Sequence, residues 1–451
     1  MKNLALFTDL YELTMAAVYF EQAMFEPASF SLYVRSYPPR RSYFVAAGLA
    51  DALDFLAALK FTPEDLAYLE STKMFKPEFL SYLENLRFTG DVYAIPEGRL
   101  FFTNEPILEV AAPMIEAQIV ETFLINALGF QSMIATKASR CVHAAWPRKL
   151  VDFSLRRTQG MDAGLKAARA SFIGGFIGSS NMLAGRQYGI PVYGTMAHSF
   201  ITSFDEERDA FRAFVRTFPE NSILLVDTYD TLTGAKKAAE VGKEMAARGQ
   251  KLKGVRLDSG DMAQLSRKVR KILDDEGLSD TMIFASGAFD ENKIKKVLDE
   301  GAAIDSFGVG TKMGVSADAP YLDLAYKLVQ YNGRPVLKLS PEKKSLASEK
   351  QIFRFTDDSG RLKKDVIGLR NDDFPESESL LKRAMAGGAI VSPSPSLLQI
   401  QKTFLDEFDR LDAAHKSLAK AKRNFPVALS PRLKSLQSQI IRRIKKRELG
   451  Y

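Results

Sequence analysis

The sequence is poor in two residue types that often carry chemistry, with one cysteine, Cys141, and three histidines among 451 residues. A single cysteine excludes an internal disulfide and a cysteine-based metal site. No apolar stretch is long enough to cross a bilayer because acidic residues interrupt the best candidates. The N-terminal residues also lack the long apolar segment of a secretory signal. These absences predict a cytoplasmic protein with no membrane partner.

Motifs that mark several common enzyme classes are also absent. The chain has no GxxxxGK(S/T) phosphate loop, no HExxH zinc motif, no GxSxG elbow and no GxGxxG at the start of a βαβ unit. Any use of ATP by this chain therefore does not involve a P-loop.

The charge balance is mildly basic. A net charge of +7 arises from 62 basic and 55 acidic residues. That excess suits a polyanionic small molecule and also permits nucleic-acid binding, for which the basic ending "IIRRIKKRELGY" is the one candidate segment. A solvated helix face is the commoner origin of such a cluster, so we expect no nucleic-acid partner.

The region from Leu150 to about Met313 alternates between short apolar runs and amphipathic helical segments. Near-continuous apolar runs indicate strands that are buried on both faces, which is typical of a parallel sheet covered by helices. Six or seven such units favour a (β/α) barrel over an open doubly wound sheet. The predicted strands are 150–155, 171–176, 190–195, 222–228, 252–259, 281–287 and 305–311.

The segments on either side of this region have other patterns, and a chain of this length is too long for one core, so we expect three parts. Residues 1–128 mix helices and strands and predict an α+β domain. We expect about 325–390 to complete it, because "YKLVQYNGRPVLKLS" is a hairpin around Asn332-Gly333. The barrel would then occupy 129–324. The remaining segment, 391–451, is predicted to be a helical, basic C-terminal extension with two apolar stripes.

Chemistry in a barrel is located at the carboxyl ends of the strands. Polar and small residues stand there in this sequence: Arg156, Arg157, Ser179, Ser180, His198, Asp227, Arg256, Asp258, Ser286, Gly287, Gly310 and Thr311. We expect them to converge on one cup at the rim of the barrel. His198 follows the run "IPVYGT" and is the best-placed histidine for nucleophilic or acid–base work.

Two further patterns point to anion binding. In "GVRLDSGD", Arg256 and Asp258 share one face of a strand end, where a carboxylate can bind ribose hydroxyls and an arginine can hold a phosphate. The turns "FASGAFDE" and "FGVGTKM" follow consecutive strands, as in the phosphate site of many barrels. The plain alternatives are a rim ion pair and glycine turns that serve the backbone alone.

In order along the chain, "TDLYELTMA", "DFSLRRTQG", "SFIGGF" with "SSN", "YGTMAHSF", "GVRLDSGD", "SGAFDE" and "GVGTKM" resemble the motifs of the nicotinate phosphoribosyltransferase family. The resemblance extends from the N-terminus to about residue 355. It implies an irregular type II phosphoribosyltransferase barrel with a sandwich-like α+β domain. The implied reaction joins nicotinate to phosphoribosyl pyrophosphate, with release of nicotinate mononucleotide and pyrophosphate and coupling to ATP hydrolysis, as the first step of NAD salvage from nicotinate.

The resemblance also implies roles for individual residues. His198 matches a histidine that ATP phosphorylates. Arg256 and Asp258 match the catalytic lining of the ribosyl pocket. Phe153 and Tyr11 match the two sides of a sandwich around the pyridine ring, with Tyr11 supplied by a second subunit, so a homodimer with shared active sites is implied. Substrate phosphate would lie on the two small-residue turns, at Ser286, Gly287, Gly310 and Thr311.

Specificity follows from charge. The related nicotinamide enzyme has an aspartate at the position that aligns with Ser180. A serine adds no negative charge there, and Arg156 and Arg157 supply positive charge, which favours the carboxylate of nicotinate. Mg²⁺ would act mainly through the substrate pyrophosphate, and the sequence identifies no protein ligands for it. A transferase for nicotinamide or quinolinate on the same fold is the alternative.

Overall fold

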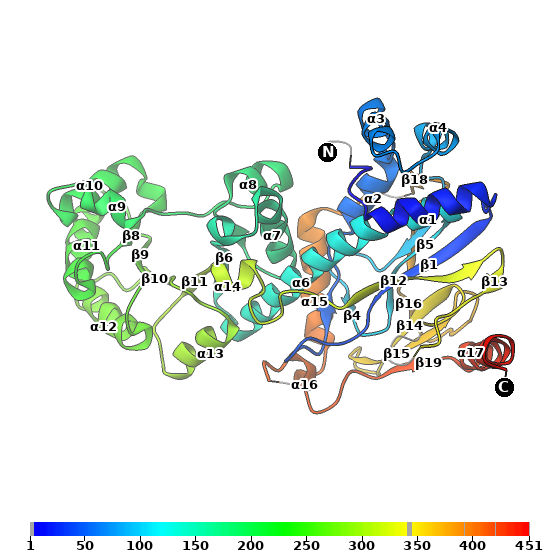
Figure 1. Cartoon of the computed structure of the whole chain (residues 1–451). Coiled ribbons are helices and arrows are strands. Elements are labelled where there is room, and N and C mark those ends of the chain that lie inside the picture. Colours follow the sequence, from blue (N-terminus) through cyan, green and yellow to red (C-terminus); the bar gives the residue numbers. More distant parts are fainter. Residues whose placement is uncertain (1–3, 341–344, 392, 420, 451) are drawn as a thin grey trace. The chain divides into compact units, whose positions relative to one another are not determined.

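In a computed structural model of the chain, residues 4–340, 345–391, 393–419 and 421–450 are described (Figure 1). The chain divides into two compact units. Unit 1 comprises Met1–Met133 and Tyr321–Tyr451, and unit 2 comprises Ile134–Pro320. Every residue of unit 2 is described, so its backbone pairing can be followed completely.

Unit 2 is built on a parallel sheet with the strand order β7-β6-β11-β10-β9-β8. The strands are β6 (Lys149–Asp152), β7 (Gly178–Ser179), β8 (Ile223–Leu225), β9 (Gly254–Leu257), β10 (Met282–Ala285) and β11 (Ser306–Val309). Because the first strand, β6, pairs with both β7 and the last strand, β11, the order is that of a ring. This confirms an irregular (β/α) barrel.

The ring has one open joint. The extended segment 190–195 meets β7 through an isolated bridge, Ser179 with Val192. No strand pairing within residues 134–320 joins that segment to β8. The barrel therefore lacks a backbone ladder at one position, which lies directly before His198.

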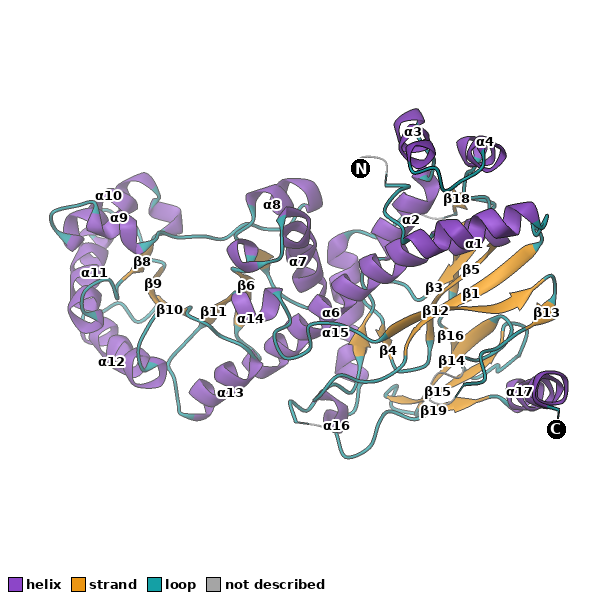
Figure 2. Cartoon of the chain, viewed as in Figure 1, coloured by secondary structure: helices purple, strands orange, loops and turns teal. Residues whose placement is uncertain are grey.

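Helices lie outside the strands of unit 2 (Figure 2). They are α7 (Met161–Ile173), α8 (Met182–Tyr188), α9 (His198–Thr202), α10 (Glu207–Thr217), α11 (Thr231–Ala246), α12 (Met262–Asp275), α13 (Glu291–Asp299) and α14 (Thr311–Gly314), with 3₁₀ turns at Leu155–Arg157 and Pro219–Asn221. Three successive helices start in the same way. Asp230, Asp261 and Asp290 cap α11, α12 and α13 by accepting the N–H group three residues later.

Two predicted strands are wrong. Residues 171–176 form the last turn of α7 and the glycine-rich loop behind it, with Ile173 and Phe176 fully buried. Residues 190–195 contribute a single bridge instead of a strand. Short buried apolar runs have no periodicity that separates a strand from a helix end, and this is the physical reason for both errors.

Unit 1 contains a seven-stranded antiparallel sheet with the order β13-β12-β1-β5-β3-β17-β18. Its strands are β13 (Arg334–Pro335), β12 (Leu324–Tyr331), β1 (Pro27–Val34), β5 (Pro106–Pro113), β3 (Asp91–Ala94), β17 (Lys382–Ala386) and β18 (Ala389–Ile390). The predicted hairpin around Asn332-Gly333 is confirmed as β12 and β13, and it rejoins the N-terminal sheet through β1.

The helices before the barrel cover this sheet, as Figure 1 shows for α1 over β1 and β5. They are α1 (Leu10–Glu21), α2 (Leu49–Ala58), α3 (Pro63–Ser71), α4 (Pro77–Asn85), α5 (Met114–Ile119) and α6 (Glu121–Ala145), whose C-terminal half belongs to unit 2; a small β2 (Phe44–Val45) and β4 (Leu100–Phe101) pair lies among them. Their apolar faces and the sheet form one core.

A second sheet of unit 1 has the order β16-β14-β15-β19. Its strands are β16 (Glu378–Ser379), β14 (Lys350–Thr356), β15 (Leu362–Leu369) and β19 (Val427–Leu429), and the C-terminal helices are α15 (Leu397–Arg410), α16 (Ala413–Lys416) and α17 (Pro431–Ile444), followed by a π-helical turn at Lys445–Leu449. The extension is mostly helical, but β19 was not predicted. Buried Arg354 joins it to the sheet by contacting Asp365 at 2.6 Å and Glu407 of α15 at 2.7 Å.

One helical stretch among the described residues, Met114–Ala145, is long and apolar enough to cross a membrane by length and composition, contrary to the sequence expectation. However, 72% of its apolar window is buried inside the protein. A core helix passes the same test. We therefore interpret α5 and α6 as core helices.

Candidate active site

The carboxyl ends of parallel strands meet at one edge of a sheet, and unit 2 places charged and small residues at that edge. Asp227 follows β8, Asp258 follows β9 and Ser286 follows β10. Main-chain bonds fix their spacing, since Val226 N–H donates to the Arg256 carbonyl and Ser286 N–H donates to the Leu257 carbonyl.

Arg256 on β9 organises the centre of this edge. Its Nε donates to Ser286 Oγ at 2.9 Å and its Nη2 donates to Asp258 Oδ1 at 3.0 Å. Its Nη1 donates to Thr195 Oγ1 at 3.1 Å and to the Met196 carbonyl at 3.0 Å. The guanidinium is thus largely occupied by protein groups, so in this arrangement it orients its neighbours instead of offering a free fork to a phosphate.

Asp258 is a carboxylate at the centre of this edge. Burial opposes its ionisation, but hydrogen bonds from Ser286 and Arg256 and the positive charge of Arg256 outweigh burial and lower its pKa. Its side chain is 33% exposed. An ionised, half-exposed carboxylate at this edge can accept hydrogen bonds from sugar hydroxyls or stabilise a nearby cation.

His198 begins α9 and has a side-chain exposure of 45%. Its Nδ1 lies 3.1 Å from Thr228 Oγ1, and its Nε2 lies 4.0 Å from Asp258 Oδ2. With Nδ1–H donating to the threonine hydroxyl, Nε2 keeps a free lone pair beside the carboxylate. The imidazole is therefore accessible and lies close to Asp258, the carboxylate that Arg256 contacts.

Asp227, which the sequence places at the rim of the barrel without a role of its own, is a further functional candidate. Its Oδ2 accepts from Asp258 N–H at 3.0 Å and from Ser259 Oγ at 2.7 Å. Its Oδ1 is buried without a hydrogen-bond partner. The signal was in the sequence, because the run "SILLVDT" ends in a carboxylate just as "GVRLDS" does.

The turn Ser286–Phe289 has the backbone of an anion site. Gly287 and Ala288 have consecutive positive φ angles of 106° and 53°. Within unit 2, the N–H groups of Gly287, Ala288 and Phe289 donate to no protein group. Successive free N–H groups in such a turn form a concavity that favours a phosphate or another oxyanion.

The second predicted turn packs beside Phe153. A Cβ atom added to Gly308 would approach the Phe153 ring to 2.6 Å, and one added to Gly310 would approach the Phe153 carbonyl to 2.9 Å. The ring of Phe153 also lies 5.6 Å from the Arg256 guanidinium carbon. Thr311 is exposed at the start of α14. The structure thus brings Phe153 and Gly310 to the same edge as Arg256.

The other predicted residues are placed more loosely. Ser180 follows β7, and its N–H donates to the Asp152 carbonyl at 2.9 Å. Arg156 and Arg157 lie exposed on a 3₁₀ turn, and within unit 2 neither forms an ion pair with Asp258, the acid that Arg256 contacts. Tyr11 belongs to unit 1, on the first turn of α1, and is 47% exposed. Burial, followed by the charge of Glu121, raises its pKa.

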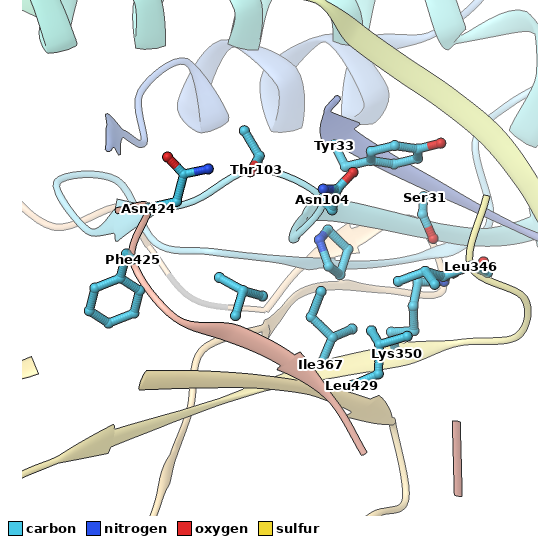
Figure 3. Close-up of a pocket in the computed structure, with 12 residues that line it drawn as sticks. Ser31, Tyr33, Thr103, Asn104, Leu346, Lys350, Ile367, Asn424, Phe425 and Leu429 are labelled. Atoms are coloured by element: carbon cyan, nitrogen blue, oxygen red, sulfur yellow. Dashed lines mark hydrogen bonds between the residues drawn. The ribbon is translucent and has the colours of Figure 1, made fainter. Parts of the chain in front are cut away.

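A cavity of about 410 Å³ lies elsewhere, within unit 1 between its two sheets (Figure 3). Tyr33 and Asn104 line one side and Ile367 and Leu429 another. Lys350 also lines it, but its ammonium contacts buried Glu109 at 3.1 Å. None of the predicted site residues is among the described residues that line this cavity.

Comparisons with known proteins agree with the sequence resemblance. Residues 6–129 match the model of the nicotinate phosphoribosyltransferase N-terminal domain, and residues 148–363 match the nicotinate phosphoribosyltransferase family model. The chain is 46% identical over 429 residues to the nicotinate phosphoribosyltransferase pncB2 of Mycobacterium tuberculosis, covering 95% of this chain and 92% of that protein.

Two further relatives extend this likeness. The nicotinate phosphoribosyltransferase of Bacillus subtilis is 36% identical over 476 residues, covering 99% of this chain and 96% of the relative. The crystal structure of human nicotinic acid phosphoribosyltransferase superposes with a TM-score of 0.85 at 29% identity, covering 96% of this chain and 99% of that one. On the family models, the full-length relatives and the shared fold, the chain belongs to the nicotinate phosphoribosyltransferase family.

Proposed function

We propose that this chain joins nicotinate to phosphoribosyl pyrophosphate and couples the reaction to ATP hydrolysis through a phosphohistidine at His198. The observation that carries the proposal is the group formed by accessible His198, ionised Asp258 and the turn 287–289 with its free N–H groups. Together they offer a nucleophile, a carboxylate and an oxyanion site.

In the transfer step, the ring nitrogen of nicotinate forms a bond to C1 of the ribosyl group. The bond from C1 to the pyrophosphate oxygen breaks, and pyrophosphate leaves with that electron pair. Positive charge develops on the ribosyl group as the bond breaks, and the Asp258 carboxylate lies at this edge to stabilise it. Free N–H groups at 287–289 would hold a substrate phosphate, so most of the catalysis is positioning and electrostatics.

In the coupling step, His198 Nε2 attacks the terminal phosphorus of ATP, and ADP leaves with the bridging oxygen. Nδ1, held by Thr228, keeps Nε2 free for the attack. Water later cleaves the phosphorus–nitrogen bond and returns the imidazole and inorganic phosphate. The Asp258 carboxylate, 4.0 Å from Nε2, would stabilise the positive charge that develops on the ring as Nε2 forms its bond to phosphorus.

Mg²⁺ fits this site through oxygen ligands. Asp227 and Asp258 follow the paired strands β8 and β9, and Asp227 Oδ1 is buried without a partner, but no group of three or more His, Cys, Asp or Glu among the described residues could hold a metal ion alone. Asp227 and Asp258 would therefore contribute one or two ligands, and substrate phosphates and water the rest. When bound, the ion neutralises charge on the leaving pyrophosphate.

Incubation with ATP labelled on its terminal phosphate tests the coupling. We expect an acid-labile label on the wild-type protein and none on His198→Ala, which should keep some uncoupled transferase activity. His143→Gln is the matched control, because it also removes an imidazole from unit 2 and should keep the label. A label that survives in His198→Ala would refute the phosphohistidine.

Competition between nicotinate and nicotinamide tests the substrate. Ser180 brings no negative charge, and Arg156 and Arg157 are exposed cations of the same unit, so nicotinate should be preferred. A strong preference for the amide, or turnover of quinolinate instead, would contradict the assignment of Ser180, Arg156 and Arg157 to recognition of the nicotinate carboxylate.

We also propose a cytoplasmic homodimer in which Tyr11 completes the partner's site. Tyr11→Ala and Asp258→Asn should each be nearly inactive. Mixing and refolding them together should restore about a quarter of the wild-type activity, because half of the dimers are mixed and each mixed dimer has one intact site. Recovery of no activity would show that each subunit supplies its own tyrosine.

A further inference from the structure

The turn Ser286–Phe289 is fixed at both ends but exposed in its middle. At the strand end, Ser286 Oγ contacts Arg256 and Asp258. At the helix end, Asp290 caps α13, and its Oδ2 lies 2.8 Å from Lys312 Nζ. Within unit 2, neither of these anchors forms a hydrogen bond with the peptide between Gly287 and Ala288.

That middle peptide is held by Lys293, which lies in the first turn of α13. Its Nζ donates to the Gly287 carbonyl at 2.6 Å. The same ammonium lies 4.6 Å from the centroid of the Phe289 ring, which is fully buried against Phe307. The lysine is thus directed onto the turn by a fixed aromatic surface.

The consequence follows from peptide geometry. The carbonyl of Gly287 and the N–H of Ala288 belong to one planar trans unit and point in opposite directions. A cation that fixes the carbonyl on one side therefore presents the Ala288 N–H on the other. Ala288 also has a left-handed φ of 53°, which an alanine adopts only when its surroundings enforce it.

We infer that Lys293 is a positioning residue for anion binding, which holds the turn so that its free N–H groups face a bound phosphate. This rests on the proposed function only for the identity of that phosphate, which would belong to phosphoribosyl pyrophosphate. Burial, then repulsion from Lys312, lowers the pKa of Lys293, while Asp290 and Asp258 oppose that shift, so a bound anion would further favour the charged form of the lysine.

Calorimetric titration of the full chain with inorganic phosphate, and separately with phosphoribosyl pyrophosphate, tests this inference. Lys293→Met keeps the methylene stem over Phe289 and removes the ammonium. We expect both dissociation constants to rise about tenfold, the loss typical of one hydrogen bond to a charged group. The KM for phosphoribosyl pyrophosphate should rise in parallel, with the KM for nicotinate unchanged.

Two variants separate this role from a structural one. Lys293→Arg restores the charge and a donor, and should bring both dissociation constants within threefold of wild type. Lys295→Met, the matched control on the same helix, removes an exposed lysine that pairs only with Asp299 at 2.9 Å and should change neither constant. Lys293→Gln is a second neutral variant, and thermal unfolding of each protein reports its fold.

Unchanged phosphate affinity in Lys293→Met and Lys293→Gln, even with a lowered unfolding temperature, would overturn the inference. So would a wild-type protein that binds neither probe. A wild type that binds phosphate in a Lys293-dependent way but forms no nicotinate mononucleotide would instead refute the proposed function and leave the inference standing.

Discussion

Gly287 is the position where one methyl group should damage the site most. Its φ of 106° lies in the region that disfavours side chains, and an added Cβ would stand 2.0 Å from the main-chain oxygen of Asp258. Ordinary contact begins at 3.4 Å, so the turn and the end of β9 would have to separate by about 1.4 Å, the difference of those two distances. Asp258 N–H is held by Asp227, so the turn is the part that yields.

Comparison with a second glycine separates the conformational cost of the added methyl group from its steric cost. Gly277 also has a positive φ, 74°, but an added Cβ there meets no atom within 4 Å. Gly277→Ala should therefore cost only the conformational term, about 1–2 kcal/mol. Gly287→Ala should cost that term plus about 1–3 kcal/mol for the clash. A shift of about 1 Å at reacting groups costs about a hundredfold in rate, so its transferase activity should fall at least that far.

Denaturant unfolding of both variants, with kcat/KM for phosphoribosyl pyrophosphate, measures both effects. Gly277→Ala should keep wild-type kcat/KM. If Gly287→Ala were no less stable than Gly277→Ala and stayed within a few-fold of wild-type activity, the close packing of the turn on β9 would not hold the site.

Two buried acids give further predictions. Burial raises the pKa of Glu12 to about 7, so its folded pKa exceeds its unfolded value of 4.5 and stability falls as the pH rises through that window. Glu12→Gln should reduce this fall in the free energy of unfolding by about 3 kcal/mol. An equal dependence of the free energy of unfolding on pH in both proteins would refute this prediction. Glu291 is fully buried and contacts Lys137 at 2.5 Å and Arg140 at 3.1 Å. Glu291→Gln should cost about 3 kcal/mol, whereas Glu300→Gln, in an exposed pair, should change the free energy of unfolding by under about 1 kcal/mol; equal losses would contradict the burial argument.

The barrel was predictable because buried parallel strands leave a distinct sequence pattern. The runs "SILLVDT" and "GVRLDS" are mostly apolar and end in a carboxylate followed by a hydroxyl residue, and they became β8 and β9. The same rule misassigned "SFIGGF", where helix α7 ends among apolar residues. Strand β19 left no such pattern, because only its pairing with β15, about sixty residues earlier, defines it.

The grouping of Arg256, Asp258 and Ser286 at one edge was predictable, because each polar residue stands at or next to the end of a predicted strand. Asp227 stands after β8 as Asp258 stands after β9, so the same sequence rule could have identified it as a candidate. Lys293 could not be found in this way, because its role depends on a side chain that reaches back six residues to a carbonyl. Such contacts depend on three-dimensional geometry that a linear pattern does not record.

The open joint of the barrel matters for what can move. Across the joint, side chains of the rim make the contacts: His198 Nδ1 lies near Thr228 Oγ1, and Arg256 donates to Thr195 Oγ1 and to the Met196 carbonyl. No strand pairing within residues 134–320 joins residues 193–197 to β8, so a rearrangement there would exchange side-chain hydrogen bonds and leave the ladders β8–β9 and β6–β7 paired. Arg256, which contacts both Thr195 and Asp258, links that stretch to the rest of the rim.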